Sequence, residues 1–563
     1  MADPSQKPLV GELNAEKAVV AERIEHVEIT SRDQLSVQTA IIAERIEHIN
    51  ITNLVRGIDE LQLATRYDSR VQNFLEYYLG AKDHPAPFGG RASDLTALDA
   101  WLNDPAAPPY ASLIAPAGRG KSALLAHWVT RSASRPATGG EAVHVVYFPI
   151  SIRFNTNLET VVFASLAARM AHVYGEKVTQ AVDAQQYRGV FSDYLRRSPP
   201  NGGRVLVVMD GLDEAAGWEA GADLFPTVPP GHLRVIVAAR PLALDIDETA
   251  WLNRLGWEMP NRAQRLSLAG FDREGVRDVL SQMGNPLDAL ATKIDLISRL
   301  YELSAGDPLL VRLYVEALLP QGAQAATLTP DDLAKLQPGL EAYFKRWFEE
   351  QQKLWGAAKP LQDKTVRGLL NLCAAALGPL KKDEVLALAP DIFEDSGLLD
   401  EAAAAVNRFI IGDGLASGYV FSHPRLGEYF AAKLTERKRQ AWQARFLQYG
   451  RDTLIGLENK TLLPKNAPAY VVQYYAAHLT QAKAPAMDFY ALVCEDWLRA
   501  WEWLDGTPAG FLNDADRAWQ KAEAKGPAAL GQQIRAAFCF ASVISLSANI
   551  QKDLLVACVK AGV

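Results

Sequence analysis

An apolar run that ends abruptly in carboxylates constrains the fold of this chain more than any other segment. Residues 205 to 209 read Val-Leu-Val-Val-Met, and Asp210-Gly-Leu-Asp-Glu214 follows directly. A continuous, mostly β-branched run is typical of a parallel strand that is buried on both faces, and ligands bind at the carboxyl end of such strands. Grouped carboxylates repel one another unless a cation or a water-filled cleft compensates them. We expect Asp210 to hold a metal ion there; the alternative is an aspartate that only caps the strand.

A second segment, Ser112 to Ser122, supplies the partner that such a strand needs. It reads Ser-Leu-Ile-Ala-Pro-Ala-Gly-Arg-Gly-Lys-Ser and precedes an amphipathic helical pattern. A strand, a loop of small residues and a helix start together present backbone N–H groups and a positive helix end to a phosphate. Lys121 is expected to reach the β- and γ-phosphates, and Ser122 to ligate magnesium. The residues expected to line the nucleotide here are Ala117, Gly118, Arg119, Gly120, Lys121, Ser122 and Ala123.

This phosphate loop has one unusual position, because Ala115 stands where a glycine is usual. Alanine fits only if φ is negative there, so the loop must turn through Gly118 and Gly120. A bare Gly-Lys-Ser also arises by chance in chains of this length. Its place between an apolar strand and a helix, about 90 residues before the carboxylate strand, makes the motif specific for a nucleotide.

Bulk composition excludes several classes of protein. The chain has 563 residues, enough for roughly three to five domains. Its apolar content of 49% and charged content of 22% are those of a soluble globular protein. A net charge of −8 argues against a dedicated nucleic-acid binder, which normally has a basic face. The longest late apolar segment, Ala536 to Leu546, is too short to span a bilayer. We therefore expect a cytoplasmic protein with no membrane span.

The first sixty residues contain an internal repeat. The segment from Ala18 to Thr30 recurs from Ala40 to Thr52, an offset of 40 − 18 = 22 residues. The end of each copy alternates as a strand does, although a helix face fits the same residues. One copy cannot bury its apolar face alone, so we expect the copies to stack on each other or on other chains. The repeat loosely resembles motifs by which some bacterial and fungal receptors template a β-stacked signal. A duplicated leader without such a role is the alternative.

The rest of the chain changes character along its length. A Pro-rich linker at 83–87 precedes alternating strands and helices, with buried strands expected at 143–150, 205–209 and 233–238, which implies a doubly wound parallel sheet. Helical patterns follow, then a hairpin between Phe409 and Phe421 that suits a winged helix. The expected divisions are an N-terminal repeat at 1–60, a linker at 61–87, a P-loop NTPase domain at 88–262, a helical domain at 263–336, a winged helix at 337–434 and a C-terminal helical region at 435–563.

Several motifs occur in one order between Phe88 and Phe430. They are Phe88-Gly-Gly-Arg91, the phosphate loop, Asp210-Gly-Leu-Asp-Glu214, Val235-Ile-Val-Ala-Ala-Arg240-Pro241, Gly306-Asp-Pro-Leu309 and Phe421-Ser-His423-Pro-Arg-Leu-Gly-Glu-Tyr-Phe430. Together they resemble the STAND class of signal-transducing ATPases, close to the NACHT branch that includes NOD-like receptors.

The resemblance implies a role for each motif. Arg91 belongs to an entry motif, Asp210 coordinates magnesium, Arg240 senses the γ-phosphate, Pro308 packs on adenine, and His423 touches the β-phosphate of ADP. With Lys121, either Glu214 or Asp213 would serve hydrolysis, and Glu214 is preferred as the base that polarises water.

Structural alternatives remain for three of these residues. Arg240 also suits a bridge to the acidic cluster, because desolvated carboxylates attract guanidinium. Pro308 suits the first turn of a helix that Asp307 caps. His423 suits an ordinary structural histidine.

The resemblance implies a nucleotide-operated switch in defence or stress signalling, with ATP or ADP and Mg²⁺ as cofactors. ADP would hold a resting state, ATP would favour self-association into an oligomer, and slow hydrolysis would reset it. The C-terminal region would sense an unknown trigger, and the N-terminal repeat would recruit an effector protein. A rival reading is a housekeeping P-loop ATPase, either a remodelling motor or a nucleic-acid-associated loader. A third is a scaffold with a degenerate nucleotide site, which Ala115 suggests.

Overall fold

The computed structural model describes residues 54 to 548 apart from gaps at 59–60, 62–66, 82–83, 135–141, 179–183, 201, 243–244, 246, 319–326, 334–335, 356–357 and 416. All of the described residues belong to one compact unit, Ile51–Val563. The duplicated motif from Ala18 to Thr52 lies outside the described residues, so its expected stacking stays a prediction.

A five-stranded parallel sheet forms the centre of the described fold, with the strand order β4-β5-β6-β3-β7. Its outer strand β4 and the strands β5 and β6 cover the segments expected from sequence almost to the residue. The strands are β3 (Tyr110–Ile114), β4 (Val143–Pro149), β5 (Arg204–Asp210), β6 (Leu233–Ala239) and β7 (Ala263–Leu266).

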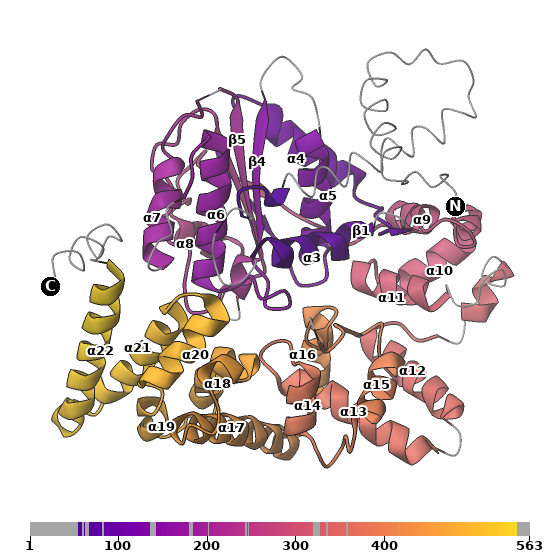
Figure 1. Cartoon of the computed structure of the whole chain (residues 1–563). Coiled ribbons are helices and arrows are strands. Elements are labelled where there is room, and N and C mark those ends of the chain that lie inside the picture. The colour runs from indigo at the N-terminus through magenta and orange to yellow at the C-terminus, as the bar shows by residue number, and fades with distance from the viewer. Residues whose placement is uncertain are drawn as a thin grey trace, which may run out of the picture. The chain divides into compact units, whose positions relative to one another are not determined.

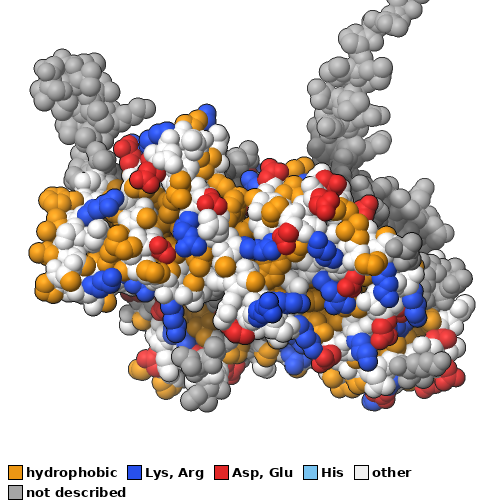
Figure 2. Space-filling model, turned by 90° about the horizontal axis from the view of Figure 1, so that it is seen from below, with side chains coloured by type: hydrophobic (Ala, Val, Ile, Leu, Met, Phe, Trp, Pro, Cys, Tyr) orange, Lys and Arg blue, Asp and Glu red, His pale blue; other side chains and the backbone are white. Residues whose placement is uncertain are grey.

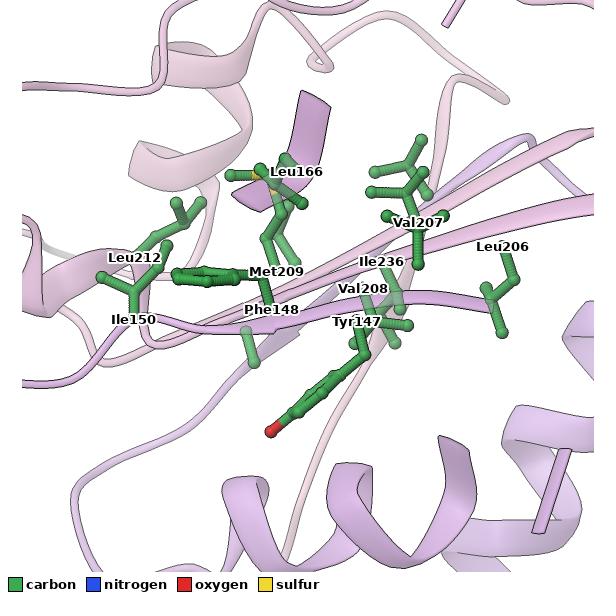
Figure 3. Close-up of a cluster of buried hydrophobic side chains, with 14 of the residues drawn as sticks. Tyr147, Phe148, Ile150, Leu166, Leu206, Val207, Val208, Met209, Leu212 and Ile236 are labelled. Atoms are coloured by element: carbon green, nitrogen blue, oxygen red, sulfur yellow. The ribbon is translucent and has the colours of Figure 1, made fainter. Parts of the chain in front are cut away.

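Helices cover both faces of this sheet, α6 and α7 on one side and α4 and α5 on the other (Figure 1). The flanking helices are α4 (Ala92–Asn103), α5 (Lys121–Ser134), α6 (Glu159–Tyr174), α7 (Ala184–Tyr194) and α8 (Thr249–Leu255). Because both faces are covered, the central strands are mostly apolar, and all residues of β6, including Arg234, are buried. Figure 3 shows Tyr147 of β4 pointing to the opposite side of the sheet from its neighbour Phe148. The expected doubly wound α/β architecture is confirmed.

The segment 61–87, expected to be a linker, contains a helix of the sheet domain. Helix α3 (Tyr67–Leu79) buries Tyr67, Val71, Phe74 and Leu75 in the same apolar core as the strands. A short antiparallel pair follows it, β1 (Gly80–Ala81) with β2 (His84–Pro85). The linker prediction is therefore wrong for the residues of α3. Their apolar side chains recur at helical spacing and form one face, which packs against the sheet domain.

Beyond β7, all described elements except one short strand pair are helical. The first group is α9 (Arg273–Gln282), α10 (Ile294–Ser304) and α11 (Pro308–Leu318). The second is α12 (Leu340–Leu354), α13 (Lys359–Ala375), α14 (Lys382–Leu388), α15 (Ser396–Ala405), β8 (Ile410–Ile411), β9 (Val420–Phe421) and α16 (Pro424–Lys433). Strands β8 and β9 pair antiparallel, as the predicted hairpin requires. Both groups share one apolar core, so no break in packing separates them.

The C-terminal elements form a further helical layer, most of whose buried residues form a third core, while Trp442, Phe446, Tyr470 and Tyr474 belong to the core of the preceding helices. They are α17 (Glu436–Glu458), α18 (Ala469–Gln481), α19 (Ala486–Tyr490), α20 (Glu495–Asp505), α21 (Ala509–Glu523) and α22 (Leu530–Ala548). Trp497 and Trp501 lie on one face of α20, and both indole N–H groups donate to Asp514 of α21, each over 3.0 Å. These tryptophans are core residues, as their spacing predicts.

Candidate functional site: a phosphate loop covered by a helix

Three strands bring their carboxyl ends together at one edge of the sheet. Strand β6 lies between β5 and β3, with Asp210 paired to Ala238 and Ile114 paired to Ala239. The residues that follow the strands therefore meet: Asp210 at the end of β5, Arg240 after β6, and the phosphate loop after β3. Sequence spacing predicts each of these segments, but only the strand order makes them neighbours.

The phosphate loop has the backbone that the sequence requires. Gly118 and Gly120 adopt φ of +84° and +87°, whereas Ala115 is not among the residues with positive φ. Lys121, at the first position of α5, is 8% exposed, and its Nζ donates to the carbonyls of Ala115 over 2.6 Å and of Pro116 over 3.2 Å. Burial lowers the pKa of Lys121, and the negative charges of Asp213 and Asp210 offset part of this decrease. The ammonium group of Lys121 thus bonds to backbone carbonyls of its own loop. The oxygens of a phosphate would be stronger acceptors than these carbonyls.

Asp210 is a buried carboxylate that makes no well-formed hydrogen bond with the described residues, although the hydroxyl groups of Ser122 and Tyr147 lie close to it. It is 2% exposed. Burial raises its pKa to about 7, while nearby Ser122 and Lys121 lower it in part. An unpaired carboxylate in a dry site is costly, and a divalent cation removes that cost. The fold is a doubly wound parallel α/β sheet with a phosphate loop after β3.

The remaining acids of this site, Asp213 and Glu214, both accept hydrogen bonds from neighbouring residues. Asp213 accepts hydrogen bonds from the backbone N–H of Arg240, over 2.8 Å, and from its guanidinium Nε. Glu214 accepts from the backbone N–H of Ile152 over 2.8 Å, and burial raises its pKa. The bridge from Arg240 to the acidic cluster, left as an alternative by the sequence, is thus present. Of the two candidate bases, Glu214 is the one without a cation in contact.

Arg91, the arginine of the Phe88–Arg91 motif, bonds to the backbone of the phosphate loop. Arg91 is 4% exposed, and its guanidinium donates to the carbonyl of Arg119 over 2.6 Å and to that of Ala269 over 2.9 Å. It also pairs with Asp94 and lies 4.7 Å from the Phe271 ring. These contacts use most of its donors, so Arg91 positions the loop; its contact with nucleotide stays a prediction.

Pro308 is the first residue of α11, as expected if its role is to begin a helix that Asp307 caps. Asp307 caps this helix, accepting from the N–H groups of Leu309 over 3.0 Å and Leu310 over 3.3 Å. Gly306 precedes the cap with a φ of +69°, and an added Cβ would lie 2.2 Å from the carbonyl oxygen of Phe271. The adenine contact of Pro308 stays a prediction.

Helix α16 covers the phosphate loop. A Cβ on Gly118 would lie 3.0 Å from Nη1 of Arg425 and 3.5 Å from Cε1 of His423. Arg425 also pairs with Asp307, and Arg240 pairs with Glu428 over 3.2 Å. Residues of one helix and its cap thus contact the loop, the start of α11 and the end of β6.

The side chain of His423 is neutral, and its hydrogen bonding shows which ring nitrogen carries the proton. Its Nδ1 accepts from the backbone N–H of Arg425 over 3.1 Å, so the proton of the neutral ring lies on Nε2. Burial lowers the pKa of His423 to about 3, and Arg153, Arg425 and Arg312 lower it further. A neutral Nε2–H among cations is a suitable donor to an anion.

The sequence motifs missed three residues beside His423. Arg153 and Tyr77 both donate to the carbonyl of Ser422, Tyr77 over 3.2 Å. Arg312 donates to the hydroxyl of Tyr77 over 2.9 Å. Arg153 and Tyr77 lie in segments without a recognised motif, so only their position in the fold identifies them.

The residues at this edge fit a magnesium nucleotide. Lys121, Arg153 and the Nε2–H of His423 are donors for phosphate, and Asp210 with Ser122 offers oxygen ligands of the kind that Mg²⁺ takes alongside phosphates. Within the described ranges, no group of three or more His, Cys, Asp or Glu side chains converges as a metal site. The phosphates would therefore supply part of the coordination of any ion here.

Comparison with known proteins gives no family assignment. No family model matches the chain, and no curated protein matches it. Solved structures that it is similar to include the Walker-type ATPase PABY2304 of Pyrococcus abyssi, at 16% identity over 61% of this chain and 96% of that chain, with a TM-score of 0.30. Others are the Aeropyrum pernix ORC1 protein in complex with DNA (14%, 64% and 96%, TM-score 0.32) and the ADP form of its ORC2 protein (13%, 65% and 98%, TM-score 0.31). No helix of the described residues is long and apolar enough to cross a bilayer.

Proposed function

We propose that this chain is a nucleotide-operated switch of the STAND and NACHT type. ADP holds the closed arrangement, ATP favours an open form that self-associates, and slow hydrolysis resets it. The observation that carries the proposal is the position of His423 and Arg425 beside Gly118 of the phosphate loop, where an added Cβ would lie 3.5 Å and 3.0 Å from them. A ligand at this loop would touch the sheet domain and the winged helix at once, so its phosphates bear on how the two pack.

The physical basis of the switch is a difference in charge between the nucleotides. A diphosphate would accept from Nε2 of His423 and from Lys121, and would stabilise the packing described here. A γ-phosphate adds negative charge next to Asp213 and Glu428, which both pair with Arg240. Each nucleotide then favours a different arrangement.

Nucleotide binding alone does not supply the free energy for the full change. A shift from 1:99 to 99:1 needs roughly 5.5 kcal/mol of differential binding, more than one hydrogen bond to His423 contributes. An additional trigger, sensed by the C-terminal helices from 435 onward, supplies the rest. The N-terminal repeat would then cluster on assembly and recruit an effector protein in the cytoplasm.

The content of the purified protein tests the proposal. We expect it to carry ADP and to bind ADP and ATP with Mg²⁺, and we expect Lys121→Ala to abolish binding, measured by chromatography of the released nucleotide and by calorimetry. A nucleotide-free, monodisperse protein that binds neither nucleotide in the micromolar range would refute it.

The histidine has its own test. His423→Ala is expected to speed ADP release and to increase particle size with ATP, measured by light scattering. His478→Ala is the matched control, because His478 is also buried but bonds to Tyr470 in the helical layer. Unchanged ADP retention and unchanged size in His423→Ala would contradict its role.

The nucleic-acid-associated alternative has no comparable support. Helix α15, the second helix of the helix-turn-helix pair α14 and α15, has Asp400 and Glu401 and no Lys or Arg. A helix that enters the major groove is normally basic or polar. On the face of the molecule drawn in Figure 2, Lys and Arg side chains are intermixed with Asp and Glu. Turnover stimulated by DNA or RNA would favour this alternative over the switch.

A further inference from the structure

Arg153 lies at the phosphate edge, in the turn that follows strand β4. Its guanidinium is 4.0 Å from the ring centroid of Tyr77 and 4.5 Å from that of Phe154. It donates to the carbonyl of Ser422, the residue before His423, and over 3.4 Å to the hydroxyl of Tyr78. The arginine therefore contacts α3 and the winged helix from its place on the sheet domain.

No carboxylate of the described residues lies within ion-pair distance of Arg153. The other arginines around His423 each have one: Arg425 pairs with Asp307, Arg312 with Glu316, and Arg240 with Asp213 and Glu428. A half-buried guanidinium normally pairs with an anion, and its planar fork suits a phosphate. Arg153 and Lys121 are both held only by neutral groups at this edge.

Arg153 lies between the acidic cluster and the winged helix. The backbone N–H of the preceding residue, Ile152, donates to Glu214, which places this turn beside the proposed hydrolytic acid. Its charge lowers the pKa of Glu214 and, more than any other single charge, that of His423. His423 is the proposed contact of the β-phosphate and Glu214 the proposed hydrolytic acid, so we expect the γ-phosphate between them, next to Arg153.

We propose that Arg153 is a second phosphate-binding arginine, which binds the terminal phosphate of a nucleoside triphosphate and is held by the Ser422 carbonyl when that phosphate is absent. This inference rests on the proposed function. A phosphate oxygen is a stronger acceptor than a carbonyl, so the triphosphate draws Arg153 from Ser422. The winged helix then loses a contact next to His423, and Tyr77 of α3 loses a cation above its ring.

The test compares nucleotide affinities of variants of the full chain. Arg153→Met removes the charge and keeps the apolar stem, and it is expected to weaken binding of Mg²⁺-loaded, non-hydrolysable ATP at least tenfold, with ADP affinity changed less than threefold. Arg153→Lys keeps a charge without the fork and is expected to give an intermediate loss. Both are measured by calorimetry.

Arg70→Met is the matched control. Arg70 on α3 donates to the carbonyl of Asn155 in the same turn over 2.7 Å, so its loss disturbs the turn without removing the proposed contact. It should leave the ratio of the two affinities unchanged. An equal loss for ADP and ATP in Arg153→Met, or no loss, would overturn the inference while leaving the switch intact. Failure of the unmodified protein to bind either nucleotide would overturn the proposed function itself.

Discussion

Arg240 and Glu428 form an ion pair, with 3.2 Å between Nη1 and Oε1, that joins the end of β6 to helix α16. The same guanidinium pairs through Nε with Asp213, which is 4% exposed, whereas Glu428 is 62% exposed. The proposed γ-phosphate sensor is thus already shared by two carboxylates in the closed arrangement. A γ-phosphate would have to compete with them, and the exposed partner is the easier one to displace.

The first prediction concerns that exposed partner. Glu428→Gln removes a negative charge beside the expected γ-phosphate and frees one side of Arg240, so it should shift the affinity ratio toward ATP over ADP by roughly three- to tenfold. Calorimetry with both nucleotides measures the ratio. Glu436→Gln, which removes an exposed carboxylate paired with Arg439 on α17, should leave it unchanged. Equal ratios in both variants would show that Glu428 does not act on the nucleotide.

The second prediction concerns the unpaired carboxylate of Asp210. Asp210→Asn removes a buried charge, so at pH 8 it should stabilise the nucleotide-free protein by on the order of 1 kcal/mol. The same change removes the expected magnesium ligand, so ADP affinity should no longer depend on Mg²⁺. Denaturant unfolding and calorimetry with and without the ion measure the two effects. Magnesium dependence that persists in Asp210→Asn would contradict the assigned role.

The third prediction uses two glycines of one loop. Gly118→Ala and Gly120→Ala both place a side chain at positive φ, a strain of about 1 kcal/mol. Only the new Cβ at position 118 meets Arg425 and His423, since nothing lies within 4 Å of one at position 120. Gly118→Ala should therefore loosen α16, seen as faster proteolysis of the intact chain between the sheet domain and the winged helix. Identical cleavage of both variants would mean that α16 does not depend on Gly118.

The fourth prediction concerns pH and the contact between α3 and α20. Tyr67 donates to the buried carboxylate of Asp505 over 3.2 Å, and burial raises the pKa of Asp505 from 3.8 to about 6. The folded state therefore holds a proton that the unfolded chain loses near pH 4, so this contribution to stability is present below that pH and is lost as pH rises to about 6.

Asp505→Asn removes this titration. Its unfolding free energy relative to the unmodified protein should rise by up to about 3 kcal/mol between pH 4 and pH 7. Denaturant unfolding at several pH values measures the difference. Asp516→Asn, an exposed position on α21, should show no such trend. A flat difference for Asp505→Asn would show that its carboxyl titrates normally in the folded protein.

Local sequence was sufficient for four of the five strands of the sheet, all but β7, and for the phosphate loop. Parallel strands that are covered on both faces are mostly apolar, so β5 and β6 are visible as nearly continuous apolar runs. Gly118 and Gly120 were predictable because only glycine adopts positive φ without strain. The hairpin of β8 and β9 followed from the glycines between them. These features depend on residues close together in the chain.

Other features depend on contacts between distant residues, and the sequence did not reveal them. Helix α3 lies in the segment expected to be a linker, because its packing partners are on the sheet domain. The pairing of Arg240 with Asp213 was one of two alternatives, and only the adjacency of β5 and β6 selects it. Arg153 belongs to no motif, and Tyr77 is 345 residues from the Ser422 carbonyl that both contact.

The sequence by itself determined that an acid, a lysine and an arginine follow buried strands, which fixes their chemistry as that of a phosphate site. Only the tertiary structure decided which of these groups are paired and which are not. Among the described residues, Asp210 has no ion-pair partner and neither does Arg153, whereas Asp213 pairs with Arg240. The reason is physical: residue type sets the charge of a group, whereas the strand order and the packing of α16 set the distance and the solvent exposure on which its energy depends.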